Sequence, residues 1–249
     1  MQLTDRVHLV GGGPWGGTGL SVDPDCHVYL IDGGDELALI DAGSGVPGSL
    51  EAITETIALS GFRIDQVTTV FVTHRHGDHL GGVAGLVEAA DAVARGSGPT
   101  IDALRSGDEE VTSISMARRA GLFPPEFELR STDAAEALTA GARVRIGEVS
   151  VTAVDTPGHC DGHLSYLLES DDRRDLFAGD AVFWRGRVLV QAVPDCDPYA
   201  LAGSLKRLAA IEQLSGFFPG HGGFTTRGGS RHIAAAAEQV RTARLPQSL

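Results

Sequence analysis

The chain has little cysteine, almost no lysine and no long apolar run, and each shortage excludes a class of protein. Its three cysteines, Cys26, Cys160 and Cys196, show no C-x-x-C spacing and are odd in number, so a disulfide framework or a cysteine-rich zinc site is not expected. No stretch approaches the ~18 apolar residues that a membrane span needs. Lys206 is the only lysine, and 33 acidic residues against 20 basic ones give a net charge of −13. Such a chain repels nucleic acid and anionic membranes, so neither is an expected partner.

Length and composition fit one α/β domain. The chain has 249 residues, of which 42% are hydrophobic and 21% charged, as in ordinary globular proteins. No low-complexity linker interrupts it, and its first residues lack the basic start and apolar run of a signal peptide. We therefore expect a single domain over residues 1–249, located in the cytoplasm, where cysteines stay reduced.

Hydrophobic patterning predicts antiparallel strands followed by a helix, a strand and a helix in each half of the chain. This order favours two sheets packed face to face with helices outside. The stretch at about 96–132 breaks the pattern, and we expect it to be an insertion that covers the active site rather than core. The expected strands are 6–10, 26–31, 37–40, 67–72, 143–146, 149–154, 164–168, 176–178 and 216–218, and the expected helices are 49–60, 83–95, 198–214 and 230–244.

The most informative segment is T-H-R-H-G-D-H-L-G-G at positions 73–82. Within six residues it holds His74, His76, Asp78 and His79, directly after an apolar, β-branched run. Imidazole and carboxylate groups are the ligands that bind zinc, iron and manganese. Four of them are more than one ion needs from a single loop. The segment therefore predicts two neighbouring metal ions.

Three further candidate ligands follow later strands, each directly after a glycine: His159, Asp180 and His221. The glycine lets the backbone turn sharply, so that the side chain can point towards an ion. Any one of these positions is as compatible with a structural turn as with a ligand. All three, together with the histidine loop, favour metal binding.

These motifs, in this order, resemble the metallo-β-lactamase superfamily, in particular its glyoxalase II and lactonase branches. The resemblance covers nearly the whole chain and implies an α/β fold, the αββα sandwich of two mixed sheets. It also implies two divalent metal ions as cofactors; zinc is expected, and iron or manganese also fit. The ligands that it implies are His74, His76 and His159 for one ion, Asp78, His79 and His221 for the other, and Asp180 as a bridge between them.

The resemblance further implies the reaction. A hydroxide bridging the two ions would open an ester-like acyl bond in a lactone or thioester, so we expect a metal-dependent hydrolase with a small-molecule acyl substrate. Asp78 is the predicted catalytic residue, because it can orient the hydroxide and pass a proton to the leaving group. Asp41 is expected to orient the ligand loop, and His163 to support the site without binding metal.

The expected substrate pocket is lined by the Trp15 loop, the 96–132 stretch, Phe183 and Trp184. Lactonases of the family carry a tyrosine where this chain has Phe183. Solvated charge is the general expectation for the arginines near these segments. Candidates for further substrate contacts are Tyr166, Tyr199, Arg118, Arg119, Arg185 and Arg187.

The histidines outside these motifs are not expected to bind metal. His27 is expected to be buried and hydrogen-bonded, whereas His8 and His232 are expected at the surface or in loops.

One alternative activity stays open. It is an oxidoreductase of the same fold with one iron or a di-iron centre, similar to persulfide dioxygenases, which metal analysis would separate from a hydrolase. A nuclease fits the negative charge poorly, and a structural metal protein would use cysteine ligands. A homodimer is compatible with the sequence.

Overall fold

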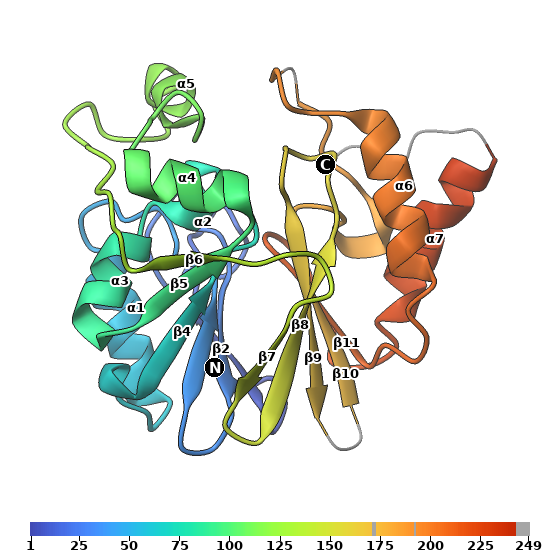
Figure 1. Cartoon of the computed structure of the whole chain (residues 1–249), viewed down its shortest axis with the longest axis horizontal. Helices are drawn as coiled ribbons and strands as arrows, with labels where there is room; N and C mark the ends of the chain where they lie inside the picture. The colour runs from blue at the N-terminus through green and yellow to red at the C-terminus, as the bar shows by residue number, and fades with distance from the viewer. Residues whose placement is uncertain (171–172, 192, 243–249) are drawn as a thin grey trace. The chain divides into compact units, whose positions relative to one another are not determined.

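The computed structural model describes residues 1–170, 173–191 and 193–242. It divides the chain into two compact units, Met1–Leu138 (unit 1) and Thr139–Leu249 (unit 2), each built on its own β-sheet (Figure 1). None of the described helices combines the length and the apolar character that a membrane crossing requires.

Unit 1 is a mixed six-stranded sheet in the order β1-β2-β3-β4-β5-β6. Its first three strands pair antiparallel, and the pairs from β3 to β6 are parallel. Parallel pairing brings the ends of β3 and β4 to the same edge of the sheet, which is where the predicted ligand loop begins. The strands are β1 (Val7–Gly11), β2 (Val28–Asp32), β3 (Leu37–Ile40), β4 (Val67–Phe71), β5 (Val93–Gly96) and β6 (Ala135–Ala137).

The helices of unit 1 bury apolar faces against this sheet. Ile53 and Ile57 of one helix and Leu86 of another join a core with Leu39 and Val70 of the strands. Burial of such side chains stabilises the unit by about 1.5–3 kcal/mol each. The helices are α1 (Ser49–Leu59), η1 (Ile64–Gln66), α2 (Gly77–Leu80), α3 (Val83–Ala90), α4 (Gly98–Ser106) and α5 (Ile114–Arg119).

The structure differs from the sequence prediction between residues 83 and 106. The helix expected over 83–95 ends at Ala90, because Asp91 takes a left-handed conformation (φ 54°), and the chain continues into β5. In the stretch expected to be an insertion, Ile101 and Leu104 of α4 are buried in the core of unit 1. This part of the 96–132 stretch is therefore a crossover between two parallel strands.

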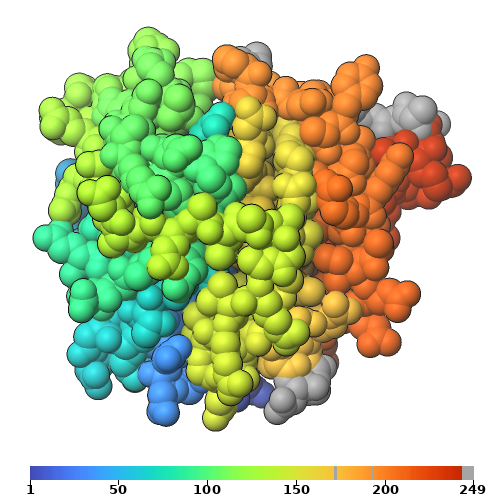
Figure 2. Space-filling view, viewed as in Figure 1, coloured from blue at the N-terminus to red at the C-terminus, as the bar shows by residue number. Residues whose placement is uncertain are grey.

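The later part of the same stretch forms a small apolar cluster of its own. Ile114, Phe123 and Phe127 pack with Val46. The region from α4 to α5, green in both views, contributes to the surface of unit 1 (Figure 2).

Unit 2 is a mixed five-stranded sheet in the order β11-β10-β9-β8-β7, with only the β10–β11 pair parallel. The helices α6 and α7 pack together over one face, where Leu205 and Ile233 meet Leu176 of the sheet (Figure 1). Asp197 caps α6 by accepting the N–H groups of the first turn. The elements are β7 (Arg143–Ile146), β8 (Val149–Asp155), β9 (Leu164–Ser170), β10 (Arg173–Gly179), η2 (Trp184–Gly186), α6 (Pro198–Ala209), β11 (Gly216–Pro219) and α7 (Ser230–Arg241). The last residues of the helix expected over 230–244 lie outside the described residues.

Candidate metal centre

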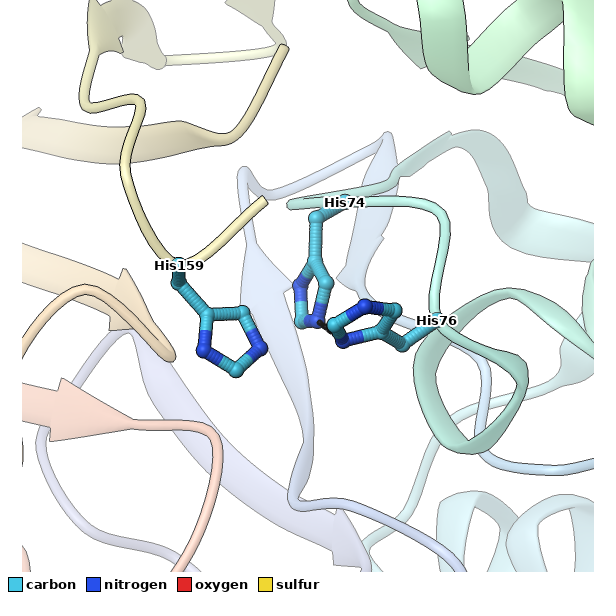
Figure 3. Close-up of side chains that lie close together, drawn as sticks. All are labelled: His74, His76 and His159. Atoms are coloured by element: carbon cyan, nitrogen blue, oxygen red, sulfur yellow. Dashed lines mark hydrogen bonds between the residues drawn. The ribbon is translucent and has the colours of Figure 1, made fainter. Parts of the chain in front are cut away.

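The loop after β4 holds two neighbouring pairs of metal-binding side chains. His74 and His79 are fully buried, and His76 is 6% exposed. Nε2 of His74 lies 3.1 Å from Nδ1 of His76 (Figure 3). At the start of α2, Oδ2 of Asp78 lies 3.5 Å from Nε2 of His79. Unit 1 therefore gathers all four ligands predicted from its sequence into a compact set of donors.

Hydrogen bonds with Asp41 and Thr73 determine which ring nitrogen His74 and His79 can offer to a metal. Its Oδ2 accepts a hydrogen bond from Nδ1 of His79 at 2.9 Å, and Thr73 donates both its N–H and its hydroxyl to the same carboxylate, at 2.7 and 2.9 Å. Because the hydroxyl proton is used there, Oγ1 of Thr73 accepts from Nδ1 of His74 at 3.0 Å. Both Nδ1 atoms thus carry protons, which leaves the Nε2 lone pairs of His74 and His79 for a metal. These hydrogen bonds agree with the orienting role predicted for Asp41.

Two glycines let other segments come close to the ligand loop. A Cβ atom at Gly77 would lie 2.3 Å from Cγ1 of Ile114, and the N–H of Gly77 donates to the carbonyl of Thr112 at 3.0 Å. A Cβ at Gly81 would lie 2.0 Å from the carbonyl oxygen of Ser44. The 108–127 segment and the 43–45 turn therefore both rest directly on the metal-binding loop.

In unit 2, one carboxylate oxygen lies between two histidines. Oδ2 of Asp180 is 3.6 Å from Nε2 of His159 and 3.7 Å from Nε2 of His221. His159 follows β8 (its ring is drawn in Figure 3), Asp180 follows β10, and His221 follows β11. These strand ends share one edge of the sheet, so the topology gathers residues that are far apart in sequence.

His163 supports this group without facing it as a ligand. Its Nε2 accepts the backbone N–H of Asp180 at 3.1 Å, and its Nδ1 donates to Oγ1 of Thr156 at 2.9 Å. Both ring nitrogens thereby have hydrogen-bond partners, and Nε2 holds the backbone at Asp180, in agreement with the supporting role expected from the sequence.

The donors within each unit fit divalent metal ions. Two nitrogen ligands of one tetrahedral zinc ion, each about 2.0–2.1 Å from the metal, are roughly 3.3 Å apart. The pairs His74–His76, Asp78–His79 and those around Asp180 are separated by 3.1, 3.5, 3.6 and 3.7 Å. A set of imidazole and carboxylate donors suits zinc, iron or manganese.

Cys26 is a further buried side chain near these donors. Its sulfur lies within 4.8 Å of ligand atoms of Asp41 and His79. Burial raises the pKa of the Cys26 thiol to about 12, so in this environment it is a neutral thiol. Because Nδ1 of His79 is already donated to Asp41, the three residues form the support of His79.

One buried carboxylate that supports the surroundings of the site, Asp25, was not predicted from the sequence. Asp25 is buried, and its carboxylate accepts from the backbone N–H of Ser44 at 2.7 Å and from the hydroxyls of Ser44 and Ser49. It thereby holds the turn on which Gly81 rests. The only signal in the sequence is an acidic residue just before an apolar strand, and that signal does not reveal its partners about 20 residues away.

The remaining histidines are all buried. His27 bonds Tyr29 and the carbonyl of Gly16, at 3.1 and 3.0 Å, as expected. The surface positions predicted for His8 and His232 are wrong, since these side chains are 6% and 2% exposed. His8 lies on the buried strand β1, and His232 faces inward on α7 because the helix turns that side towards the sheet.

The candidates for substrate contacts separate into groups. Tyr166 is buried on β9, whereas Tyr199 is 91% exposed at the start of α6. Arg118 is ion-paired with Glu109 at 2.7 Å, and Arg119 lies 3.8 Å from a carboxylate of the same segment. By contrast, a cavity of about 390 Å³ in unit 2 is lined by Phe183, Trp184, Arg185, Arg187 and His221.

A known protein family and several known proteins match most of the chain. The sequence profile of the metallo-beta-lactamase superfamily matches residues 22–230. A lactamase-like protein, adaB, of Aspergillus niger is 29% identical over 222 residues, which are 89% of this chain and 56% of that protein. A hydroxyacylglutathione hydrolase of Cupriavidus taiwanensis is 30% identical over 198 residues, 77% of this chain and 63% of that one. An atrochrysone carboxyl ACP thioesterase of Aspergillus fumigatus is 26% identical over 79% of this chain and 37% of its own length. This chain thus spans less than two thirds of each of these relatives.

Solved structures share the fold. BJP-1, a subclass B3 metallo-beta-lactamase of Bradyrhizobium japonicum, superposes with a TM-score of 0.72 at 20% identity, covering 98% of this chain and 91% of that chain. The Rm3 metallo-beta-lactamase gives 0.70 at 21% identity, with 97% and 91% covered. The predicted α/β fold class is therefore confirmed.

Proposed function

Because the chain belongs to the metallo-beta-lactamase superfamily, we propose that it is a dinuclear metal-dependent hydrolase of ester-like acyl bonds, in a thioester or a lactone. The observation that carries the proposal is the position of Asp180, one of whose oxygens lies next to two histidines in unit 2. A carboxylate oxygen in that position suits a ligand shared by two ions. The names of two relatives, a hydroxyacylglutathione hydrolase and an ACP thioesterase, favour a thioester.

The proposed ligand sets combine donors from both halves of the chain. One ion is assigned to the pair His74 and His76 together with His159. The other ion is assigned to the pair Asp78 and His79 together with His221. Asp180 is shared. In full, the sets are His74, His76, His159 and Asp180 for the first ion, and Asp78, His79, His221 and Asp180 for the second.

The metals and the side chains have separate tasks in this proposal. The proposed ligands would hold two divalent ions, which would supply a water with its pKa lowered to about 7 and would polarise the acyl carbonyl. Asp41 and Thr73 keep two histidines in the tautomer that can bind metal, and His163 fixes the backbone of Asp180. Asp78, whose side chain is 27% exposed, can orient the water and carry a proton. A carbon–oxygen bond to water forms, the bond to the leaving group breaks, and the leaving group departs with the proton.

Metal counting in variants tests the ligand sets. We expect two ions per wild-type chain, one after His76→Ala, and one after His159→Ala. Because these two histidines are assigned to the same ion, the double variant should also retain one. Loss of both ions in the double variant, or a single ion in the wild type, contradicts the assignment.

Hydrolysis assays test the reaction class. Metal-loaded protein should turn over thioesters or lactones, and Asp78→Asn should remove most of this turnover while Asp102→Asn, a matched change on an exposed face of α4, leaves it intact. Turnover of phosphodiesters alone would refute the acyl-hydrolase assignment. A single iron ion with oxygen consumption would instead support the persulfide-dioxygenase-like alternative.

A further inference from the structure

The cavity beside His221 in unit 2 combines aromatic walls with two arginines. Its volume is about 390 Å³, and Phe183, Trp184, Arg185 and Arg187 line it together with His221. The ring of Phe183 lies 6.4 Å from the ring of His221. A molecule in this cavity would therefore touch a proposed metal ligand, aromatic surface and positive charge at once.

A tight turn presents the two arginines. The N–H of Phe183 donates to the carbonyl of Arg187 at 2.8 Å, and the N–H of Gly186 donates to the carbonyl of Phe183 at 3.0 Å. Inside this turn Arg185 has a left-handed backbone, with φ 62° and ψ 24°. Glycine or asparagine is the usual residue at such a position, and an arginine there is strained. Strain of this kind persists only where the surroundings hold it.

His232 supplies that support from beneath the turn. Its Nδ1 accepts the backbone N–H of Arg185 at 3.0 Å. The imidazole lies against Trp184, at a ring distance of 4.1 Å, and stacks on Phe217 at 5.1 Å. The buried histidine therefore fixes both the strained residue and the tryptophan beside it.

Within the described part of the chain, the two arginines differ from other arginines in their ion pairing. Arg118 is ion-paired with Glu109 at 2.7 Å, whereas no described carboxylate forms an ion pair with Arg185 or Arg187. Both of these side chains are exposed, and the guanidinium of Arg231 adds further positive charge 6.0 Å from the ring of Trp184. The described lining of the cavity holds two arginines and no acidic side chain, which is a local reversal of charge in a chain with a net charge of −13.

We infer that the substrate carries a carboxylate or phosphate group, which Arg185 and Arg187 bind while Trp184 packs against the adjoining part of the molecule. The planar guanidinium donates paired hydrogen bonds to either anion, and its stable charge gives a preference over neutral substrates. The inference rests on the proposed function in treating the occupant as a substrate, and it deepens that function by giving the substrate a charge.

Matched thioesters test this preference in the metal-loaded protein. One set of three valeryl thioesters differs in the leaving thiol: uncharged N-acetylcysteamine is compared with the anionic thiols 3-mercaptopropionate and coenzyme A. A second set differs in the acyl group, valeryl against glutaryl on N-acetylcysteamine. We expect kcat/KM for an anionic member to exceed that of its neutral partner by about tenfold or more.

Variants of the turn assign the preference to its arginines. Arg185→Gln with Arg187→Gln should reduce the preference to about twofold or less. Arg185→Gly, which relieves the left-handed strain and so keeps the turn, should lose part of it without loss of folding. Arg145→Gln, on β7 at the opposite edge of the same sheet, is the matched control and should retain the full preference.

Binding measured without turnover separates this inference from the proposed function. Non-cleavable thioether analogues of the same compounds are titrated into a Trp15→Phe background, in which Trp184 is the only tryptophan. Arginine-dependent binding of the anionic thioethers without hydrolysis of any thioester or lactone would uphold the charged site and refute the hydrolase. Hydrolysis with no preference for the anion, or with a preference that the arginine variants leave unchanged, would overturn the inference alone.

Discussion

Replacing Asp41 by asparagine tests how the histidines are set for metal binding. Asp41 has a left-handed backbone with φ 62°, a conformation that asparagine tolerates well, so the substitution keeps both the shape and the backbone. Oδ1 of Asp41 accepts the N–H of Thr73 at 2.7 Å, so this oxygen remains an oxygen in the variant. The amide NH₂ must then take the place of Oδ2, which faces Nδ1 of His79 at 2.9 Å.

That exchange changes the tautomer of His79. An NH₂ group can only donate, so Nδ1 of His79 must accept, and the ring proton moves to Nε2. The Nε2 lone pair assigned to the metal is then lost. Removal of such an orienting partner lowers metal affinity by 10- to 100-fold, or about 1.4–2.7 kcal/mol. The Thr73 hydroxyl also lies 3.0 Å from Oδ1 of Asp41 and can still donate to that oxygen, so His74 keeps its bond to Thr73. The ion assigned to His74 and His76 should therefore change much less.

Chelator competition with zinc or cobalt measures this effect. We expect one of two binding steps to weaken by 10- to 100-fold in Asp41→Asn. Asp25→Asn is the control, because Asp25 is also buried and bonded to hydroxyls but does not touch a proposed ligand. It should lower the stability of the metal-free protein while leaving both steps within about threefold. Unchanged affinity in Asp41→Asn, or an equal weakening of both steps, would refute the tautomer argument.

Three further predictions concern stability. Chelation of the metals should lower the free energy of unfolding by about 2.7 kcal/mol per ion present at 100 times its Kd, or very roughly 5–10 °C in Tm, which scanning calorimetry with and without chelator measures. Gly77→Ala should lower the free energy of unfolding by about 1–3 kcal/mol, because its Cβ would lie 2.3 Å from Ile114. Denaturant titration should find a smaller loss in an Ile114→Ala background, and equal losses would contradict the contact. Burial, together with the charges of Arg231 and Arg185, lowers the pKa of His232 in the folded protein. As the pH falls, the histidine therefore binds a proton in the unfolded chain before it does so in the folded one, and the free energy of unfolding falls below about pH 6.5. His232→Gln should make that fall shallower between pH 7 and pH 5, and an unchanged slope would show that His232 does not contribute.

The sequence predicted most of the fold because its strands carry strong local signals. β3 and the strand that precedes the ligand loop were placed to within a residue, since short apolar runs bounded by turns specify them. The pattern was insufficient for Val93–Gly96, which a helical pattern also fits. Its parallel pairing with β4 stabilises the strand, and that partner lies more than 20 residues away.

For the candidate site, the sequence by itself determined which donor groups are present and in what order. The residue type determines which ligand atom is available, and each donor follows a strand and a sharp turn. The tertiary structure alone decided how those groups are used. Asp41 reaches Thr73 and His79 only because β3 and β4 pair in parallel, and this contact selects the nitrogen that can bind metal. In the same way, Arg118 pairs with Glu109, whereas none of the described carboxylates pairs with Arg185. Hydrogen bonding and charge pairing depend on which distant segments meet, and that is a property of the folded chain rather than of local sequence.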